Sequence, residues 1–288
     1  MKHILEIKNF SKRYQSSAIE NISFSLEPGY VMGLIGPNGA GKTTIIKAIM
    51  NLIKKDDGVI NVFGLDHIVH EQVIKDQIGF VYDENYFYEH LTPKQIESII
   101  SPFYSEWNHQ LFKSYLERFE ILQNQKIKQM SKGMKMKFSI AMALSHNAKL
   151  LILDEPTAGL DPIVRRTILD ILREVIAGGD RSVLFSTHIT GDLEQIADYI
   201  TFVHQGKLIF SKEKEELYDQ YAIVKGEKGI LDRDIRKLFL SVDENPYGFE
   251  GLTAHIDQLR PLLDEQVIIE RPTLEQIMVY TVRGKCCD

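Results

Sequence analysis

A glycine-rich loop near the start of the chain constrains its fold more than any other feature of the sequence. Gly36, Gly41, Lys42 and Thr43 follow the spacing G-x-x-x-x-G-K-T, directly after the apolar run 31–35. Glycine lets the backbone adopt positive φ and approach a ligand closely, so that successive N–H groups can point at one phosphate. The spacing therefore predicts a phosphate-binding loop that connects a buried strand to a helix.

The residues after this loop predict a helix whose N-terminus faces the same anion. Apolar side chains recur from Lys42 onward at helical spacing, at Ile45, Ile46, Ile49, Leu52 and Ile53. The positive end of the helix dipole would add to the attraction of the loop for a phosphate.

Composition narrows the class of protein. A chain of 288 residues exceeds one average domain, which predicts one large α/β unit with a smaller appendage. A net charge of -6 and a pI near 5.9 provide no global attraction for nucleic acid, so we expect no nucleic-acid partner. Cys286 and Cys287 are adjacent, where a disulfide would be strained, which fits a reducing compartment.

The sequence also bears on how the protein meets a membrane. No apolar run approaches the roughly 20 residues that a membrane-spanning helix needs. Residues 1–9 do not read as a secretory signal. We therefore expect a cytosolic protein, or one held at a membrane by a partner.

Two kinds of strand are predicted. Apolar residues alternate with polar ones before residue 30, at Leu5 and Ile7 and again from Ile22 to Leu26, which is typical of antiparallel strands with one face in water. Short continuous apolar runs then recur, separated by helical stretches, at 78–81, 150–153, 183–185 and 200–203. This pattern indicates a buried parallel sheet, whose ligands gather at the carboxyl ends of the strands.

The strand signal disappears from about residue 86 to 129, and apolar residues at helical spacing predict an inserted helical lobe over about 86–135. We place the main domain at 1–211, with this lobe inside it, and a C-terminal accessory region of mixed α and β character at 212–288. The accessory region opens on a charged run, 212–216, interpreted as a solvated helix face. Thr273 and Gln276 predict a capping box for a last helix.

Two carboxylates stand at the exit of one predicted core strand. The run 150–153 ends in Asp154 and Glu155, and a charge at the end of a buried strand needs a partner. A magnesium ion bridging two phosphates would supply it, with the Thr43 hydroxyl bound directly and Asp154 bound through water. Glu155 is then free to deprotonate an attacking water. The pattern predicts hydrolysis of the phosphate ligand as well as binding.

A histidine is predicted at the same edge of the sheet. His188 follows the strand that ends near Thr187, so its imidazole can reach the terminal phosphate and position the water. A lone histidine is more often structural than catalytic. Its place at the end of the next strand after Glu155 favours a functional interpretation.

The order and spacing of these motifs resemble the ATP-binding cassette (ABC) ATPases, over residues 4 to about 211. In that family a segment L-S-G-G-Q lies between the helical lobe and the aspartate strand. Here residues 130–134 read M-S-K-G-M, which keeps Ser131 and Gly133 and places Lys132 at one glycine position. Ser131 is expected to cap the following helix, and Lys132 to contact either phosphate or solvent. The resemblance implies a P-loop NTPase core with ATP and Mg²⁺ as cofactors.

The resemblance assigns roles residue by residue. It implies that two cassettes, identical or different, pair head to tail, with ATP clamped between the phosphate loop of one and Ser131, Lys132 and Gly133 of the other. Tyr14 matches the aromatic residue that stacks on adenine, and Asp161 lies in the loop that couples the two sites. The nucleotide-binding residues are then Tyr14, Gly36, Asn38, Gly39, Ala40, Gly41, Lys42, Thr43 and Thr44.

One position departs from the family. Asp83 stands where ABC ATPases carry a glutamine that senses the terminal phosphate. It can still bind magnesium, but its shorter reach and full charge change the geometry that couples the ATP site to the membrane subunit. Just beyond it, the aromatic stretch 86–88 lies where the family has a groove for a short helix of that subunit. These rings are equally interpretable as core.

The resemblance predicts the ATPase subunit of a bacterial drug, antibiotic or peptide exporter of the bacitracin type, bound to a permease at the cytoplasmic face of the plasma membrane. Three alternatives remain. A soluble ABC ATPase acting on DNA or ribosomes usually carries long coiled coils or two linked cassettes, which are missing from this sequence. A nucleotide kinase would not need the Ser131 segment. A regulatory subunit without hydrolysis would not need Glu155.

Overall fold

A computed structural model describes residues 2–83, 87–262 and 267–285. The chain divides into two compact units, Met1–Ser211 and Lys212–Asp288. Tyr86 and the two cysteines, Cys286 and Cys287, lie outside the described residues.

The first unit is built on a ten-stranded sheet, ordered β5-β4-β1-β2-β10-β9-β3-β8-β7-β6. Its N-terminal part is antiparallel, as the alternating pattern predicts, because β1 pairs with both β2 and β4. Its central part, from β9 to β6, is parallel. The strands are β1 (Leu5–Arg13), β2 (Ala18–Leu26), β3 (Val31–Ile35), β4 (Asp57–Val62), β5 (Leu65–Asp66), β6 (Ile78–Val81), β7 (Leu150–Asp154), β8 (Ser182–Thr187), β9 (Tyr199–His204) and β10 (Lys207–Glu213).

Helix α1 (Lys42–Ile49) packs its apolar face into a core cluster that also takes side chains from β1, β2, β4 and β7. The helix is shorter than its apolar pattern predicts. Asn51 adopts a positive φ of 52°, which ends the helix in the manner of a left-handed C-terminal residue. Leu52 is consequently exposed, and only Ile53 of the last two predicted helical positions packs against the core.

Helix α7 (Thr190–Ile196) packs against β3, and a glycine makes this contact possible. A Cβ at Gly33 would lie 2.5 Å from Leu193 Cδ1, so any larger residue would force the Leu193 side chain out of its present position against the strand. Helix α2 (Glu71–Lys75) lies next to β6 in the chain and contacts it.

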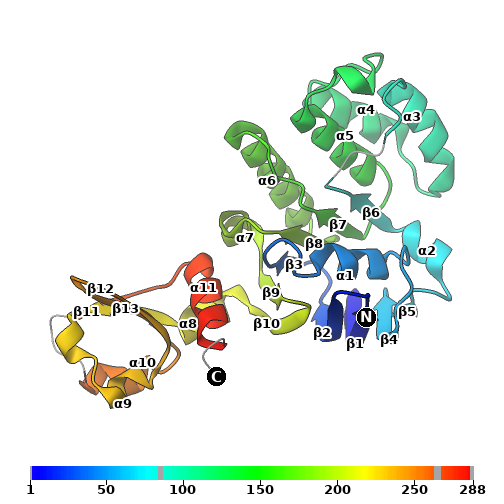
Figure 1. Ribbon diagram of the computed structural model, residues 1–288. Helices are drawn as coiled ribbons and strands as arrows, with labels where there is room; N and C mark the ends of the chain where they lie inside the picture. The colour runs from blue at the N-terminus through cyan, green and yellow to red at the C-terminus, as the bar shows by residue number, and fades with distance from the viewer. Residues whose placement is uncertain (1, 84–86, 263–266, 286–288) are drawn as a thin grey trace. The chain divides into compact units, whose positions relative to one another are not determined.

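The predicted helical lobe contains α3 (Pro93–Ile100), α4 (His109–Arg118) and α5 (Lys132–Leu144), grouped beyond the β6 end of the sheet (Figure 1). Each helix begins at a polar cap: Thr92 in a capping box, Asn108 and Ser131. The cap predicted at Ser131 is thereby confirmed. The 3₁₀ turns η1 (Ser101–Phe103) and η2 (Ile127–Gln129) complete the lobe. Helix α6 (Pro162–Ala177) follows β7 and begins at Asp161, with Pro162 as its first residue.

The lobe meets the sheet at a buried histidine. His146 is 1% exposed, stacks on Tyr104 with ring centroids 3.9 Å apart, and has no hydrogen bond from either ring nitrogen within the described residues. Burial lowers the pKa of His146 to about 4, and Arg181 adds to this effect while Asp76 opposes it. The imidazole is therefore neutral in the folded protein at neutral pH.

This histidine predicts a loss of stability in mild acid. Because its pKa of about 4 in the folded state is below the ordinary 6.5, the unfolded chain takes up a proton first as the pH falls below 6.5. We expect the free energy of unfolding to drop by about 2–3 kcal/mol from this residue between pH 7.5 and 4.5. Urea unfolding at both pH values tests this. His146→Phe keeps a ring against Tyr104 and should lose this part of the pH dependence. If the free energy of unfolding falls equally in the variant, the pH dependence comes from other residues.

The second unit, described by itself, is a four-stranded sheet ordered β12-β13-β11-β14, with all pairs antiparallel. Helix α11 contacts β12 and β13, while Ile235 and Leu259, from α9 and α10, join the apolar cluster of Phe239 and Phe249. The elements are α8 (Lys214–Gln220), β11 (Ala222–Gly226), η3 (Lys228–Ile230), α9 (Arg233–Arg236), β12 (Phe239–Asn245), β13 (Gly248–Thr253), α10 (Ile256–Leu259), η4 (Arg260–Leu262), β14 (Ile268–Glu270) and α11 (Leu274–Lys285).

Two predictions about this second unit have different outcomes. The capping box is confirmed, because Gln276 N–H donates to Thr273 Oγ1 and Thr273 N–H donates to Gln276 Oε1. The charged run 212–216 is only partly helical: β10 extends to Glu213 and α8 begins at Lys214. Lys212 pairs with Glu216 across this junction, so the charges join the strand end to the helix.

Candidate functional site

The phosphate loop lies between β3 and α1 and depends on its glycines. Gly39 and Gly41 adopt positive φ of 80° and 109°. A Cβ at Gly36 would lie 2.1 Å from Val203 O, so the loop could not approach β9 with any other residue there. Gly41 is the N-cap of α1 and provides no side-chain hydrogen bond to it. The helix N-terminus thus follows directly from the loop, as the sequence predicts.

Apart from Tyr14, the other predicted nucleotide-binding residues lie in this loop or in the first turn of α1. Ala40 is buried, and its carbonyl accepts a hydrogen bond of 3.1 Å from the Gly206 amide after β9. Asn38 is exposed, while Thr43 and Thr44 are half-buried in the first turn of α1. The loop is therefore fixed to the sheet on one side and open on the other.

Lys42 connects the loop to the predicted catalytic carboxylate. Its side chain is 5% exposed, and its Nζ lies 2.8 Å from Gly36 O and 3.2 Å from Glu155 Oε1. The ammonium group thus lies between the loop backbone and the residue after β7. From there it can neutralise the charge of Glu155 or that of an anion bound by the loop.

Glu155 and His188 are brought together by neighbouring strands. His188 Nδ1 lies 2.8 Å from Glu155 Oε2, and the His188 backbone N–H donates to the same oxygen at 3.3 Å. Glu155 has a positive φ of 49°, which for a residue other than glycine costs about 1–3 kcal/mol. The Glu155 N–H donates to Ser186 O of β8, which helps to hold this backbone. Lys42, Glu155 and His188 therefore form one continuous contact, in which the Glu155 carboxylate lies between the ammonium group and the imidazole.

Asp154 is fully buried at the end of β7, and neither carboxylate oxygen has a hydrogen-bond partner in the described part of the chain. Burial raises the pKa of Asp154, the nearby charge of Asp83 raises it further, and the hydroxyls of Thr43 and Ser186 act in the opposite direction without completing a bond. Asp83 follows β6, the strand next to β7.

This donor set fits a magnesium ion. A buried carboxylate without a partner, beside a threonine hydroxyl, is the arrangement that Mg²⁺ uses when phosphates and water supply its remaining ligands. Among the described residues no cluster of three or more histidine, cysteine or acidic side chains could hold a metal by itself. A cation here would therefore depend on a phosphate ligand.

Tyr14 lies beside the phosphate loop. It lines a cavity of about 360 Å³ together with Gly39, Gly41 and Thr44, and the residue is 48% exposed. Lys12 Nζ lies 5.7 Å from the centre of the ring. A flat, accessible ring at the mouth of the loop can stack on a base.

The residues of the predicted signature form a second cluster, at the N-termini of α5 and α6. Ser131 Oγ accepts from Met134 N–H, and Asp161 Oδ1 accepts from Val164 N–H, so both cap their helices. A Cβ at Gly133 would lie 3.0 Å from Val164 Cγ1, which places the two helix ends in close contact. Lys132 Nζ donates to Ala158 O at 2.8 Å, which ties the start of α5 to the loop after Glu155.

Sequence reasoning missed a buried network that supports the site. Asp192 on α7 is 0% exposed, accepts from Thr157 Oγ1 at 2.6 Å, and pairs with Arg165 Nε at 2.5 Å. It joins the loop after Glu155 to α6 and to the helix after His188. In the sequence Asp192 resembles an ordinary acidic residue in a first helical turn, and its only distinctive feature is its place four residues after His188.

Comparison with known proteins decides the family. The ABC transporter family model matches residues 19–158. The ABC transporter ATP-binding protein NatA of Bacillus subtilis is 31% identical over 231 residues, which cover 75% of this chain and 92% of NatA. The chain belongs to the ABC transporter ATP-binding proteins. The bacitracin transport ATP-binding protein BcrA of Bacillus licheniformis is likewise 31% identical, over 73% of this chain and 69% of BcrA.

The fold agrees with this family. A solved ATP-binding subunit of an ABC transporter superimposes with a TM-score of 0.69 at 28% identity, over 75% of this chain and 92% of that structure. The ABC family, its fold and its ATPase activity, all predicted from the motifs, are confirmed. In the described ranges none of the helices of this ABC ATPase has the length and apolar character that a bilayer span requires.

Proposed function

We propose that this ABC ATPase subunit binds Mg²⁺-ATP in the phosphate loop, hydrolyses it at Glu155, and thereby drives export of a small molecule or peptide through a separate permease. The observation that carries the proposal is the continuous contact of Lys42, Glu155 and His188. It places a charge for the phosphates, a carboxylate base and an imidazole at one edge of the sheet.

The proposed chemistry follows from these positions. Glu155 accepts a proton from the attacking water, and His188 donates to the terminal phosphate and orients Glu155 through their 2.8 Å contact. Lys42 moves from the Gly36 carbonyl to the phosphates. Thr43 and Asp154 would hold Mg²⁺, with Asp83 beside them, and the ion would neutralise charge on the phosphates.

We further propose that two cassettes pair, as a homodimer or with a second ABC ATPase. Ser131 and Gly133 lie at the N-terminus of α5, where the hydroxyl, an amide and the helix dipole can act on a phosphate. They belong to a cluster with Asp161 that is distinct from the phosphate loop, which supports a role toward the ATP of the other cassette. Tyr14 is proposed to stack on the adenine.

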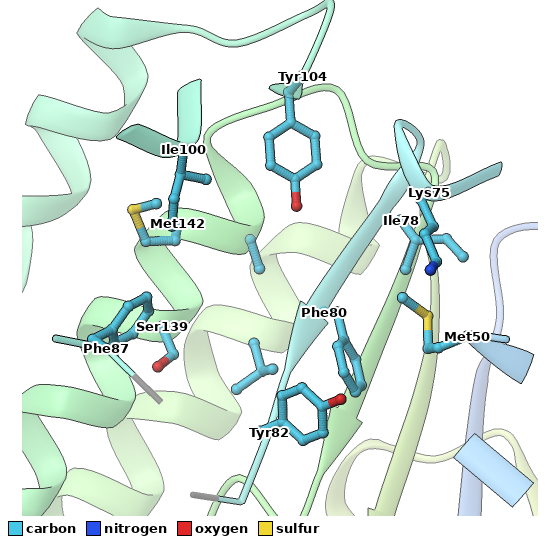
Figure 2. A pocket seen from close by; sticks show the side chains of 12 residues that line it. Met50, Lys75, Ile78, Phe80, Tyr82, Phe87, Ile100, Tyr104, Ser139 and Met142 are labelled. Atoms are coloured by element: carbon cyan, nitrogen blue, oxygen red, sulfur yellow. The ribbon is translucent and has the colours of Figure 1, made fainter. Parts of the chain in front are cut away.

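The permease is proposed to dock on an apolar cavity between the lobe and the sheet. This cavity, of about 360 Å³, is lined by β6 and α5 and by single residues of other elements. In Figure 2, Phe80 and Tyr82 lie on one side, with Phe87 and Met142 across from them and Tyr104 at the top. Apolar, aromatic surfaces of this kind accept a short amphipathic segment of a partner. Docking there would place the subunit at the cytoplasmic face of the membrane.

Copurification tests this docking. From detergent-solubilised membranes we expect the chain to bring down a protein with several membrane spans. Phe87→Ala should reduce the captured permease about tenfold while nucleotide binding is retained, because aromatic anchors dominate interfaces. Leu122→Ala, an exposed apolar residue of the same lobe outside the cavity, is the control. Capture of ribosomes in place of a permease would favour the soluble alternative. Equal capture of the permease by Phe87→Ala and Leu122→Ala would show that the permease does not dock at this cavity.

A further inference from the structure

Lys132 makes a contact that a glycine at its position could not make. It is the first residue of α5, and its Nζ donates to the carbonyl oxygen of Ala158 at 2.8 Å. A Cβ at Gly159 would lie 2.9 Å from the same Nζ. Gly159, with a positive φ of 67°, thus leaves the room through which the lysine reaches the loop.

The position of this lysine breaks a local rule. A cation in the first turn of a helix opposes the positive end of the helix dipole, and acidic residues are favoured there instead. A hydrogen bond from the ammonium group to a backbone carbonyl offsets this cost. Residues that are unfavourable for their own helix but are compensated by a contact elsewhere are typical of functional sites.

The contacted loop leads back to the backbone of Glu155 through one hydrogen bond. Ala158 accepts from Lys132 through its carbonyl, and its N–H donates to Glu155 O at 3.2 Å. Leu160 N–H donates to Thr157 O at 3.3 Å, so the loop is one tight turn. Thr157 is in turn held by Asp192. Lys132 is therefore the contact that joins the start of α5 to the turn that follows Glu155.

We propose that Lys132 is a positioning residue: it fixes the turn 157–161 and, through it, the orientation of Glu155. This links the segment that faces the ATP of the other cassette to the hydrolytic carboxylate of its own chain. The effect on turnover rests on the proposed function, whereas the effect on the turn does not. The two are therefore tested separately.

The first test measures the turn itself, in the full chain without nucleotide or permease. Hydrogen exchange at the Ala158 and Leu160 amides is compared between the parent, Lys132→Met and Lys132→Arg. Losing one charged hydrogen bond should speed exchange at these amides about fivefold in Lys132→Met, and the arginine variant should largely restore protection. Lys135→Met removes a lysine of the same helix that pairs with Glu89 and should leave these amides unchanged. Unchanged exchange in Lys132→Met would overturn the proposal.

The second test measures turnover by the assembled complex. Lys132→Met should lower kcat about threefold to tenfold with little change in the affinity of the chain for ATP, and Lys132→Arg should recover most of the rate. Faster exchange with an unchanged kcat would overturn the link to Glu155. Weaker ATP-driven pairing of cassettes with normal exchange would also overturn it, because Lys132 would then act on phosphate directly. If Glu155→Gln leaves turnover intact, the proposed function fails while the exchange test still stands.

Discussion

Glu155→Gln is expected to lower the rate of ATP hydrolysis by at least about a hundredfold while ATP binding is retained. A positioned general base contributes about 10²–10⁴-fold, and glutamine keeps the shape of the side chain but cannot accept the proton. Its amide can still contact Lys42 and His188, which lie 3.2 Å and 2.8 Å from the two carboxylate oxygens. Steady-state phosphate release and equilibrium ATP binding, measured on the same preparation, separate the two effects.

The bound ATP should then keep two cassettes of the variant together. In the proposed cycle ATP closes the pair and hydrolysis reopens it, so a chain that binds without hydrolysing accumulates as a closed dimer. Size-exclusion chromatography with Mg²⁺-ATP measures this. Phosphate release at the parent rate would remove Glu155 as the base, and His188 would become the next candidate.

Asp192→Ala is expected to have the largest effect on stability. Removing one partner of a buried ion pair costs about 3–5 kcal/mol, and we expect the lower end because Arg165 is 29% exposed. Thr157 also loses the acceptor of its 2.6 Å hydrogen bond. At about 2–4 °C per kcal/mol for a unit of this size, thermal unfolding should shift down by about 6–12 °C.

An exposed aspartate provides the matched control for Asp192. Asp170 pairs with Arg173 at 2.8 Å, but both side chains are more than two-fifths exposed, so Asp170→Ala should cost less than about 1 kcal/mol. Calorimetric or circular-dichroism melts of both variants make the comparison. Equal shifts would mean that the Asp192 network does not hold the site together.

The residues that the sequence predicts well are those whose chemistry is local. The phosphate loop follows from glycines that need positive φ, and the caps at Ser131 and Asp161 follow from side chains that bond the next amides. The position of Glu155 near His188 follows from a simple rule, that parallel strands present their carboxyl ends at one edge.

The features that the sequence does not reveal depend on contacts between distant segments. Asp192 meets Thr157 and Arg165 from different elements, and apart from its place four residues after His188 its local sequence is that of a solvated acid. Lys132 is similar, because the carbonyl it contacts lies 26 residues away. The early end of α1 depends on one left-handed residue, Asn51, which an apolar periodicity cannot register.

Phosphate release in a single turnover is the most direct measurement of the central claim, that Glu155 acts on ATP held in the phosphate loop. ATP is first bound to the parent and to Glu155→Gln, and rapid mixing with Mg²⁺ then starts the reaction. The account predicts one phosphate released per site from the parent and uncleaved ATP retained by the variant. Equal rates of release from the two chains would contradict it.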